Sequence, residues 1–325
     1  NLLNVKFFKL MMSLLRAYTR HLDPTKLKQD QDELLIETIN PRVYTDILHL
    51  FHRISEKFLI DMDFMSPFVI NLTVQILTVL DHVFTFISKC KPDSIDFLKN
   101  MSLVFLIMSN LLKNKSINFS IFQYYENMSY SNVIGKIFDL FLRLSFDVLL
   151  QYPKLIKRYL LFMKSLFGED IGTFLSLDEI FVQHHLQILN SILNLDNKEL
   201  SLESAEILRL FISSLNNMEL QMIRNTFNTV ISQIIQSALC FVFKRDIIDE
   251  TINKLIYYYL LEFPKQRQDV FDRIFVSVED DDIQNKLHSC YTKITNSFEG
   301  MNEIIGARNL SESLKAFLYF TRKNQ

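Results

Sequence analysis

Apolar residues recur every three or four positions along almost the whole chain, and strand-type alternation is sustained nowhere. This spacing places the apolar side chains on one face of a helix. The uncharged run from Asn225 to Phe243 is long enough to cross a bilayer, but amides and hydroxyls line one side of it. Its apolar face is formed by Phe227, Val230, Ile231, Ile234, Ala238 and Phe241. We therefore predict an all-α protein in which this run is a buried amphipathic helix, without membrane insertion.

The periodic segments predict a series of helices with recognisable start signals. The expected spans are 2–22, 32–39, 42–60, 67–90, 94–113, 117–125, 132–151, 153–167, 178–195, 199–215, 219–243, 246–262, 264–276, 280–297 and 311–322. Ser176-x-x-Glu179 has the form of a capping box, and similar patterns begin at Asp196 and Asn309. Ser66-Pro67 provides a cap followed by proline at the first helical position.

Two similar stretches predict sharp corners between helices. Leu149 to Lys154 reads LLQYPK, and Leu260 to Lys265 reads LLEFPK. A residue that precedes proline is disfavoured in the α region, so Tyr152 and Phe263 should each end a helix. The proline that follows can begin the next helix, where its missing N–H costs nothing. The two stretches are expected to share this corner chemistry without occupying equivalent positions in a repeat.

Many helices with short connections predict an α-solenoid of HEAT-like antiparallel helix pairs, with an irregular helical bundle as the alternative. No linker rich in glycine, serine or proline divides the chain, so residues 1–325 are expected to form one continuous solenoid. The apparent repeat period is about 35–45 residues. Because helical periodicity is already present from Val5 to Leu15, and the first residue is Asn1, the chain is expected to be a fragment of a longer protein.

Composition and motifs argue against most kinds of chemistry. The five glycines form neither a dinucleotide fingerprint nor a P-loop, and the net charge of −2 gives no general attraction to nucleic acid. Three scattered cysteines have no metal-ligand spacing and favour a reducing compartment, the nucleus or cytosol. The histidines at 49, 52, 184 and 185 lack a third metal ligand, and the acidic run 279–282 fits the start of a helix. We predict no enzyme activity, no cofactor and no metal.

Charge is nevertheless unevenly distributed along the chain. Residues 101–167 contain 8 lysines and arginines against 3 acidic residues, whereas residues 168–235 contain 3 against 9. The candidate partner-binding residues are Lys154, Lys157, Arg158 and Lys164 on one helix and Glu199, Glu203 and Glu206 on another. Each set also fits an ordinary solvated helix face. Both helices are second members of their pairs, a layer that often lines the binding surface of a solenoid.

Three stretches resemble a known family when they are taken together. They are Lys6 to His21 with Leu34 to Asp63, the junction from Phe146 through LLQYPK to Tyr159, and the final segment Leu310 to Gln325. In order and spacing they resemble the C-terminal part of the exportin-4 and exportin-7 branch of the importin-β (karyopherin) superfamily, with exportin-4 the closer. The resemblance consists of apolar and aromatic positions around one specific junction.

This resemblance implies HEAT repeats that bind folded protein cargo in a Ran-GTP-dependent manner. It also implies shuttling between nucleus and cytoplasm, contacts with nucleoporin FG repeats, and a cargo similar to translation factor 5A. The N-terminal repeats with which such receptors chiefly hold Ran are missing from this chain. The family has no catalytic residues to assign. A static helical-repeat scaffold, such as a pore, coat or phosphatase-regulatory subunit, is the alternative, and an all-α enzyme is a third reading that would require a magnesium or hydrophobic-ligand pocket.

Overall fold

The structure, a computed structural model, describes five main stretches of the chain, and every regular element within them is a helix. These stretches are residues 41–57, 67–114, 129–215, 227–245 and 249–263, with shorter pieces at 272, 282, 285, 288–289, 291–293, 309–310, 312–313 and 315. The predicted all-α class is confirmed. Contacts group the chain into two compact units, Asn1–Leu177 and Asp178–Gln325. A single continuous solenoid over 1–325 stays a prediction.

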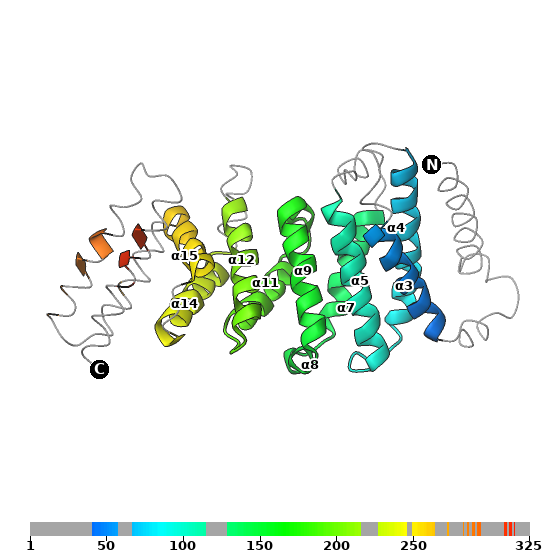
Figure 1. Ribbon diagram of the computed structural model, residues 1–325, viewed down its shortest axis with the longest axis horizontal. Helices are drawn as coiled ribbons and strands as arrows, with labels where there is room; N and C mark the ends of the chain where they lie inside the picture. The colour runs from blue at the N-terminus through cyan, green and yellow to red at the C-terminus, as the bar shows by residue number, and fades with distance from the viewer. Residues whose placement is uncertain are drawn as a thin grey trace, which may run out of the picture. The chain divides into compact units, whose positions relative to one another are not determined.

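The first unit stacks its helices in two layers, as the side-by-side ribbons in Figure 1 show. One layer consists of α3 (Pro41–Lys57), α5 (Ile95–Lys113) and α9 (Pro153–Glu169), in which α5 contacts both neighbours. The other layer contains α4 (Pro67–Ile87) and α7 (Ser129–Leu142), which contact each other. The short helices α8 (Phe146–Gln151) and α10 (Ile171–Leu175) both pack on α9.

Hydrogen bonds between neighbouring helices fix the direction of the α3–α5–α9 layer. Among the described residues, four bonds within this layer join one side chain to another: Thr45 to Asn100 and Asn110 to Ser55 between α3 and α5, and Arg158 to Ser102 and Ser109 with Ser165 between α5 and α9. Their partners are 55 or 56 residues apart in the sequence. Since this offset is constant along the helices, neighbours within the layer run parallel and in register. The predicted period of about 35–45 residues is therefore wrong for this unit, whose neighbouring helices are offset by 55 or 56 residues.

In the other layer of the same unit, Arg143 links the end of α7 to the backbone that follows α4. Arg143, just after α7, donates from its guanidinium to the carbonyl oxygens of Ser88 at 2.7 Å and Cys90 at 3.2 Å. The same guanidinium lies 5.6 Å from the centre of the Phe97 ring. The carbonyl groups at the end of a helix have no partner within it, so Arg143 satisfies backbone acceptors that follow α4.

The described part of the second unit contains two helix pairs. The first pair is α11 (Glu179–Leu193) with α12 (Lys198–Ser214), and the second is α14 (Asn228–Arg245) with α15 (Glu250–Glu262). Contacts between α11 and α14, and between α12 and α15, make two layers. Each pair packs together across a short connection, which requires antiparallel helices. Asn194 donates to Ser237 Oγ at 3.0 Å across 43 residues, within the predicted repeat period.

Both units bury their apolar faces in the way that the periodicity predicts. The apolar positions of the uncharged run in α14, from Phe227 to Phe241, are buried. In the first unit the Phe105 ring lies 5.4 to 5.7 Å from the rings of Phe141, Tyr159 and Phe162. One described helix, α5, is long and apolar enough to cross a membrane, yet 72% of the relevant window is buried inside the protein. The helix α5 is accordingly the centre of a protein core.

Several helix boundaries differ from the prediction. The expected helix 132–151 is divided into α7 and α8, because Ser145 accepts a hydrogen bond from the Val148 N–H and begins a new helix. The N-cap of α11 is Asp178 and not Ser176, and that of α12 is Asn197 and not Asp196. In each case a neighbouring polar side chain reaches the free N–H groups of the first turn. The short helix α10 was not expected, and the residues on either side of Asn309–Leu310 lie outside the described part of the chain.

The two corners adopt nearly the same backbone geometry. Tyr152 has φ −124° and ψ 73°, and Phe263 has φ −124° and ψ 64°. Each of these residues ends a helix, as predicted from the following proline. Pro153 begins α9, and Pro264 lies outside the described residues. The Phe263 ring stacks on Tyr259 with centroids 5.2 Å apart.

Candidate partner-binding surfaces

The four basic residues predicted as a candidate site lie on one stripe of α9. Lys154, Lys157 and Lys164 are exposed, and Arg158 is half-buried. The opposite face of the helix is buried against α5 and the core through residues such as Tyr159 and Met163. The first turn of α9 contains no acidic residue. The prediction of a clustered basic stripe therefore agrees with the placement of these side chains.

Arg158 is held in place by the neighbouring helix. Its Nη1 donates a hydrogen bond to Ser102 Oγ on α5 at 2.6 Å. Burial lowers the pKa of Arg158. Within the described residues no carboxylate forms an ion pair with it. A guanidinium has five N–H donors, so one bond to a neutral hydroxyl leaves most of its donor capacity for another molecule or for water.

A further lysine that the sequence pattern missed lies next to this stripe. Lys113 is the last residue of α5 and is exposed. The buried hydrogen bond between Ser109 and Ser165, 2.8 Å long, brings the ends of α5 and α9 together. Burial lowers the pKa of Lys113, and the charge of Lys164 lowers it further. We call Lys113, Lys154, Lys157, Arg158 and Lys164 the basic surface.

The charge of Arg158 also influences the pKa of a histidine on α3. His52 is half-buried, and burial is the main cause that lowers its pKa. Arg158, Arg53 and His49 lower the pKa of His52 further, and Glu56 opposes them. Arg158 therefore acts electrostatically across the layer.

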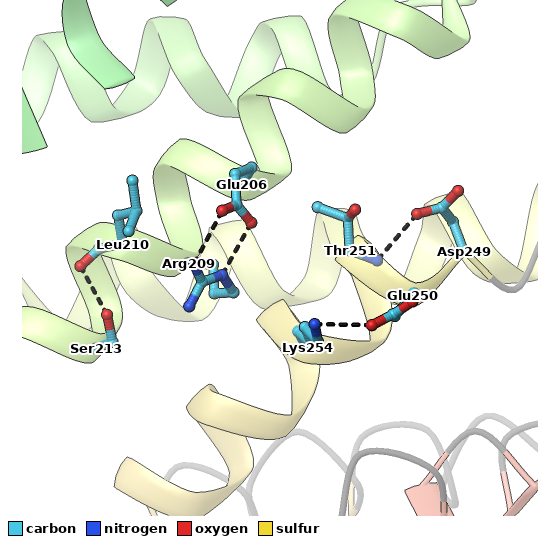
Figure 2. A network of polar contacts seen from close by, with 8 residues as sticks. All are labelled: Glu206, Arg209, Leu210, Ser213, Asp249, Glu250, Thr251 and Lys254. Atoms are coloured by element: carbon cyan, nitrogen blue, oxygen red, sulfur yellow. Dashed lines mark hydrogen bonds and ion pairs between the residues drawn. The ribbon is translucent and has the colours of Figure 1, made fainter. Parts of the chain in front are cut away.

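The three residues of the predicted acidic stripe on α12 differ from one another in their contacts. Glu199 and Glu203 are exposed, but Glu206 accepts two hydrogen bonds from Arg209, each 2.9 Å long. The Arg209 guanidinium also lies 5.6 Å from the centre of the Tyr258 ring on α15. Figure 2 shows this bidentate pair. Glu206 is thus part of the contact between α12 and α15.

Local capping positions α15 for that contact. Asp249 Oδ1 accepts a hydrogen bond from the Thr251 N–H at 2.9 Å, and Lys254 forms an ion pair with Glu250 at 2.7 Å (Figure 2). The cap satisfies a first-turn N–H, and the acidic Glu250 complements the helix dipole. These contacts define the start of the helix that carries Tyr258.

The described histidines and acids differ widely in burial and do not gather into a metal-binding group. Among the described residues no group of three or more histidine, cysteine, aspartate or glutamate side chains could hold a metal ion. His184 is exposed, whereas His185 is fully buried, and burial lowers the pKa of His185 to about 3. Of the acidic run 279–282 only Asp282 is described, in helical conformation and exposed.

Comparison with known proteins gives one informative similarity. No protein-family model matches the chain. Exportin-7 of Dictyostelium discoideum is 27% identical over 186 residues, which represent 53% of this chain and 18% of that protein. The similarity supports an exportin-like relationship. The matched segment is a small part of exportin-7.

Proposed function

We propose that this chain forms HEAT-type repeats of an exportin-like nuclear transport receptor of the importin-β superfamily. In this proposal it contributes to the C-terminal part of the receptor, binds folded protein cargo under the control of Ran-GTP and shuttles between nucleus and cytoplasm. The observation that carries the proposal is the similarity to exportin-7 over 186 residues. Helix pairs stacked in two layers within each unit are the architecture that such repeats require.

The mechanism would be binding without covalent chemistry. In stacked helix pairs, exposed side chains of one layer form an extended surface for a partner. The basic surface on α5 and α9 and the exposed acids Glu199 and Glu203 on α12 are the candidates for such contacts. Translation factor 5A-like cargo, nucleoporin FG repeats and a closer relation to exportin-4 than to exportin-7 belong to the same proposal.

The decisive experiment is a pull-down with the endogenous protein in the presence of Ran locked in its GTP form or in its GDP form. Proteins retained only with Ran-GTP would support an exportin, and proteins released by Ran-GTP would instead indicate an importin. Partners whose retention is the same with both forms would overturn the transport proposal and favour the static scaffold. Purified Ran in both forms, applied directly to the protein, serves as the control for indirect capture.

A further inference from the structure

Three residues of the basic surface combine an oriented guanidinium with exposed ammonium groups. Arg158 is oriented by Ser102, and the exposed Lys154 and Lys164 lie on either side of it along α9. Within the described residues none of these three forms an ion pair. By contrast, Lys136 on α7 and Arg209 on α12 each have an acidic partner.

The position of these charges within α9 costs the fold some stability. Lys154, Lys157 and Arg158 lie in the first two turns, and the first turn has no acidic residue. The N-terminal end of a helix carries a partial positive charge, so cations placed there are unfavourable and anions favourable. The helix end and the charge of Lys154 therefore add to one positive potential at the start of α9. Acidic residues in the first turn of α9 would stabilise the helix better, as Glu250 does in the first turn of α15.

The geometry points to an acidic segment of a partner protein as the ligand of the basic surface, with a carboxylate bound by the guanidinium of Arg158. The planar fork of an arginine matches a carboxylate through two parallel hydrogen bonds, and the surrounding lysines would attract further acidic residues. This inference names the class of partner for one surface of the proposed receptor, and it rests on the proposed function only in taking the partner to be a protein.

Protein carboxylates fit this surface better than nucleic acid does. Sites for single-stranded nucleic acid combine basic residues with exposed aromatic rings on which bases stack. The aromatic residues of α9, Tyr159, Phe162 and Phe167, are all buried.

The test is direct binding of a fluorescein-labelled glutamate-rich peptide, measured by fluorescence anisotropy at low ionic strength and without Ran. A peptide with glutamine in place of glutamate is the control ligand. We expect Arg158→Gln to weaken binding by about tenfold, the effect of losing one charge-assisted contact. Arg158→Lys should also weaken binding, because an ammonium cannot form the bidentate fork. Added salt should weaken binding by the wild-type chain.

Lys136→Gln is the matched control, since it removes the same charge from an exposed lysine on α7 in the other layer. It should leave peptide affinity unchanged. If Arg158→Gln does not fold, as judged by circular dichroism, the double variant Lys154→Gln/Lys164→Gln removes two exposed charges and should weaken binding severalfold.

Equal affinity for the glutamate and glutamine peptides, or equal effects of Arg158→Gln and Lys136→Gln, would overturn the inference. Binding of a labelled single-stranded RNA in preference to the glutamate peptide would also overturn it, in favour of a phosphate polymer. Because Ran is absent, the result is separate from the test of the proposed function. If retention proved independent of Ran while the peptide bound through Arg158, the transport proposal would fall and this inference would stand.

Discussion

Buried His185 should make the second unit sensitive to mild acid. Its side chain is fully buried in α11, and burial lowers its pKa from 6.5 to about 3, with a smaller contribution from the charge of His184. In the unfolded chain the imidazole regains a pKa near 6.5 and takes up a proton more readily than in the folded protein. The contribution of His185 to stability is therefore complete above pH 6.5 and is lost as the pH falls toward 3.

The size of this loss of stability follows from the difference between the pKa values of His185 in the folded and the unfolded chain. Between pH 7 and pH 5 the linkage relation gives a loss of about 2 kcal/mol in the free energy of unfolding from this one side chain. The loss corresponds to the uptake of nearly one additional proton on unfolding at pH 5. It is a large part of the roughly 5–15 kcal/mol that stabilises a typical domain.

Urea unfolding followed by far-ultraviolet circular dichroism at several pH values would measure this loss. His185→Leu removes the titrating group and keeps an apolar core, so its stability should fall less steeply between pH 7 and pH 5 than that of the wild type. His184→Gln is the comparison variant: burial also lowers the pKa of His184, but His184 is exposed, so its loss should flatten the slope less than His185→Leu does. Identical pH dependence in the wild type and His185→Leu would refute the reasoning.

Three other substitutions should change stability in predictable directions, each measured by urea unfolding. Gly135→Ala in α7 should stabilise the protein by about 0.5–1 kcal/mol, because the added Cβ would contact nothing within 4 Å and glycine is unfavourable within a helix. A destabilised variant would contradict this. Arg143→Ala should destabilise by about 1–3 kcal/mol through loss of two hydrogen bonds and a ring contact, and Arg143→Lys should not restore both bonds. Asp249→Ala should lower the free energy of unfolding by about 1 kcal/mol, because it removes the cap of α15. Asp249→Asn should keep most of this stability, because asparagine also caps helices.

Much of the fold could be predicted from the sequence because helices depend on local patterns. Apolar periodicity located the helices, and the residues before proline, Tyr152 and Phe263, ended them as expected. The prediction was weaker where several polar side chains compete for the same backbone groups. Asp178 caps α11 although Ser176 had the better sequence pattern, and Ser145 interrupts a run whose apolar periodicity continues through it. Such choices depend on packing, which a single sequence does not reveal.

The candidate surfaces were predictable only in part, for a related reason. The spacing of Lys154, Lys157 and Lys164 along α9 placed them on one face, and the structure agrees. Lys113 could not be found in this way, because it joins the group through the packing of α5 on α9. The register of 55 or 56 residues that produces this packing exceeds the period expected from the sequence.

Counting charges along a sequence does not show which of them an outside partner can use. Glu206 belongs to the more strongly charged block of the chain, but its carboxylate is engaged by Arg209, which in turn lies over Tyr258. Arg158 belongs to the less strongly charged block, yet its contact is a neutral hydroxyl and its full charge remains. Replacing Glu206 should therefore disturb the contact between α12 and α15, whereas replacing Arg158 should chiefly affect binding. Of the two predicted surfaces, the basic one is for this reason the stronger candidate for a partner.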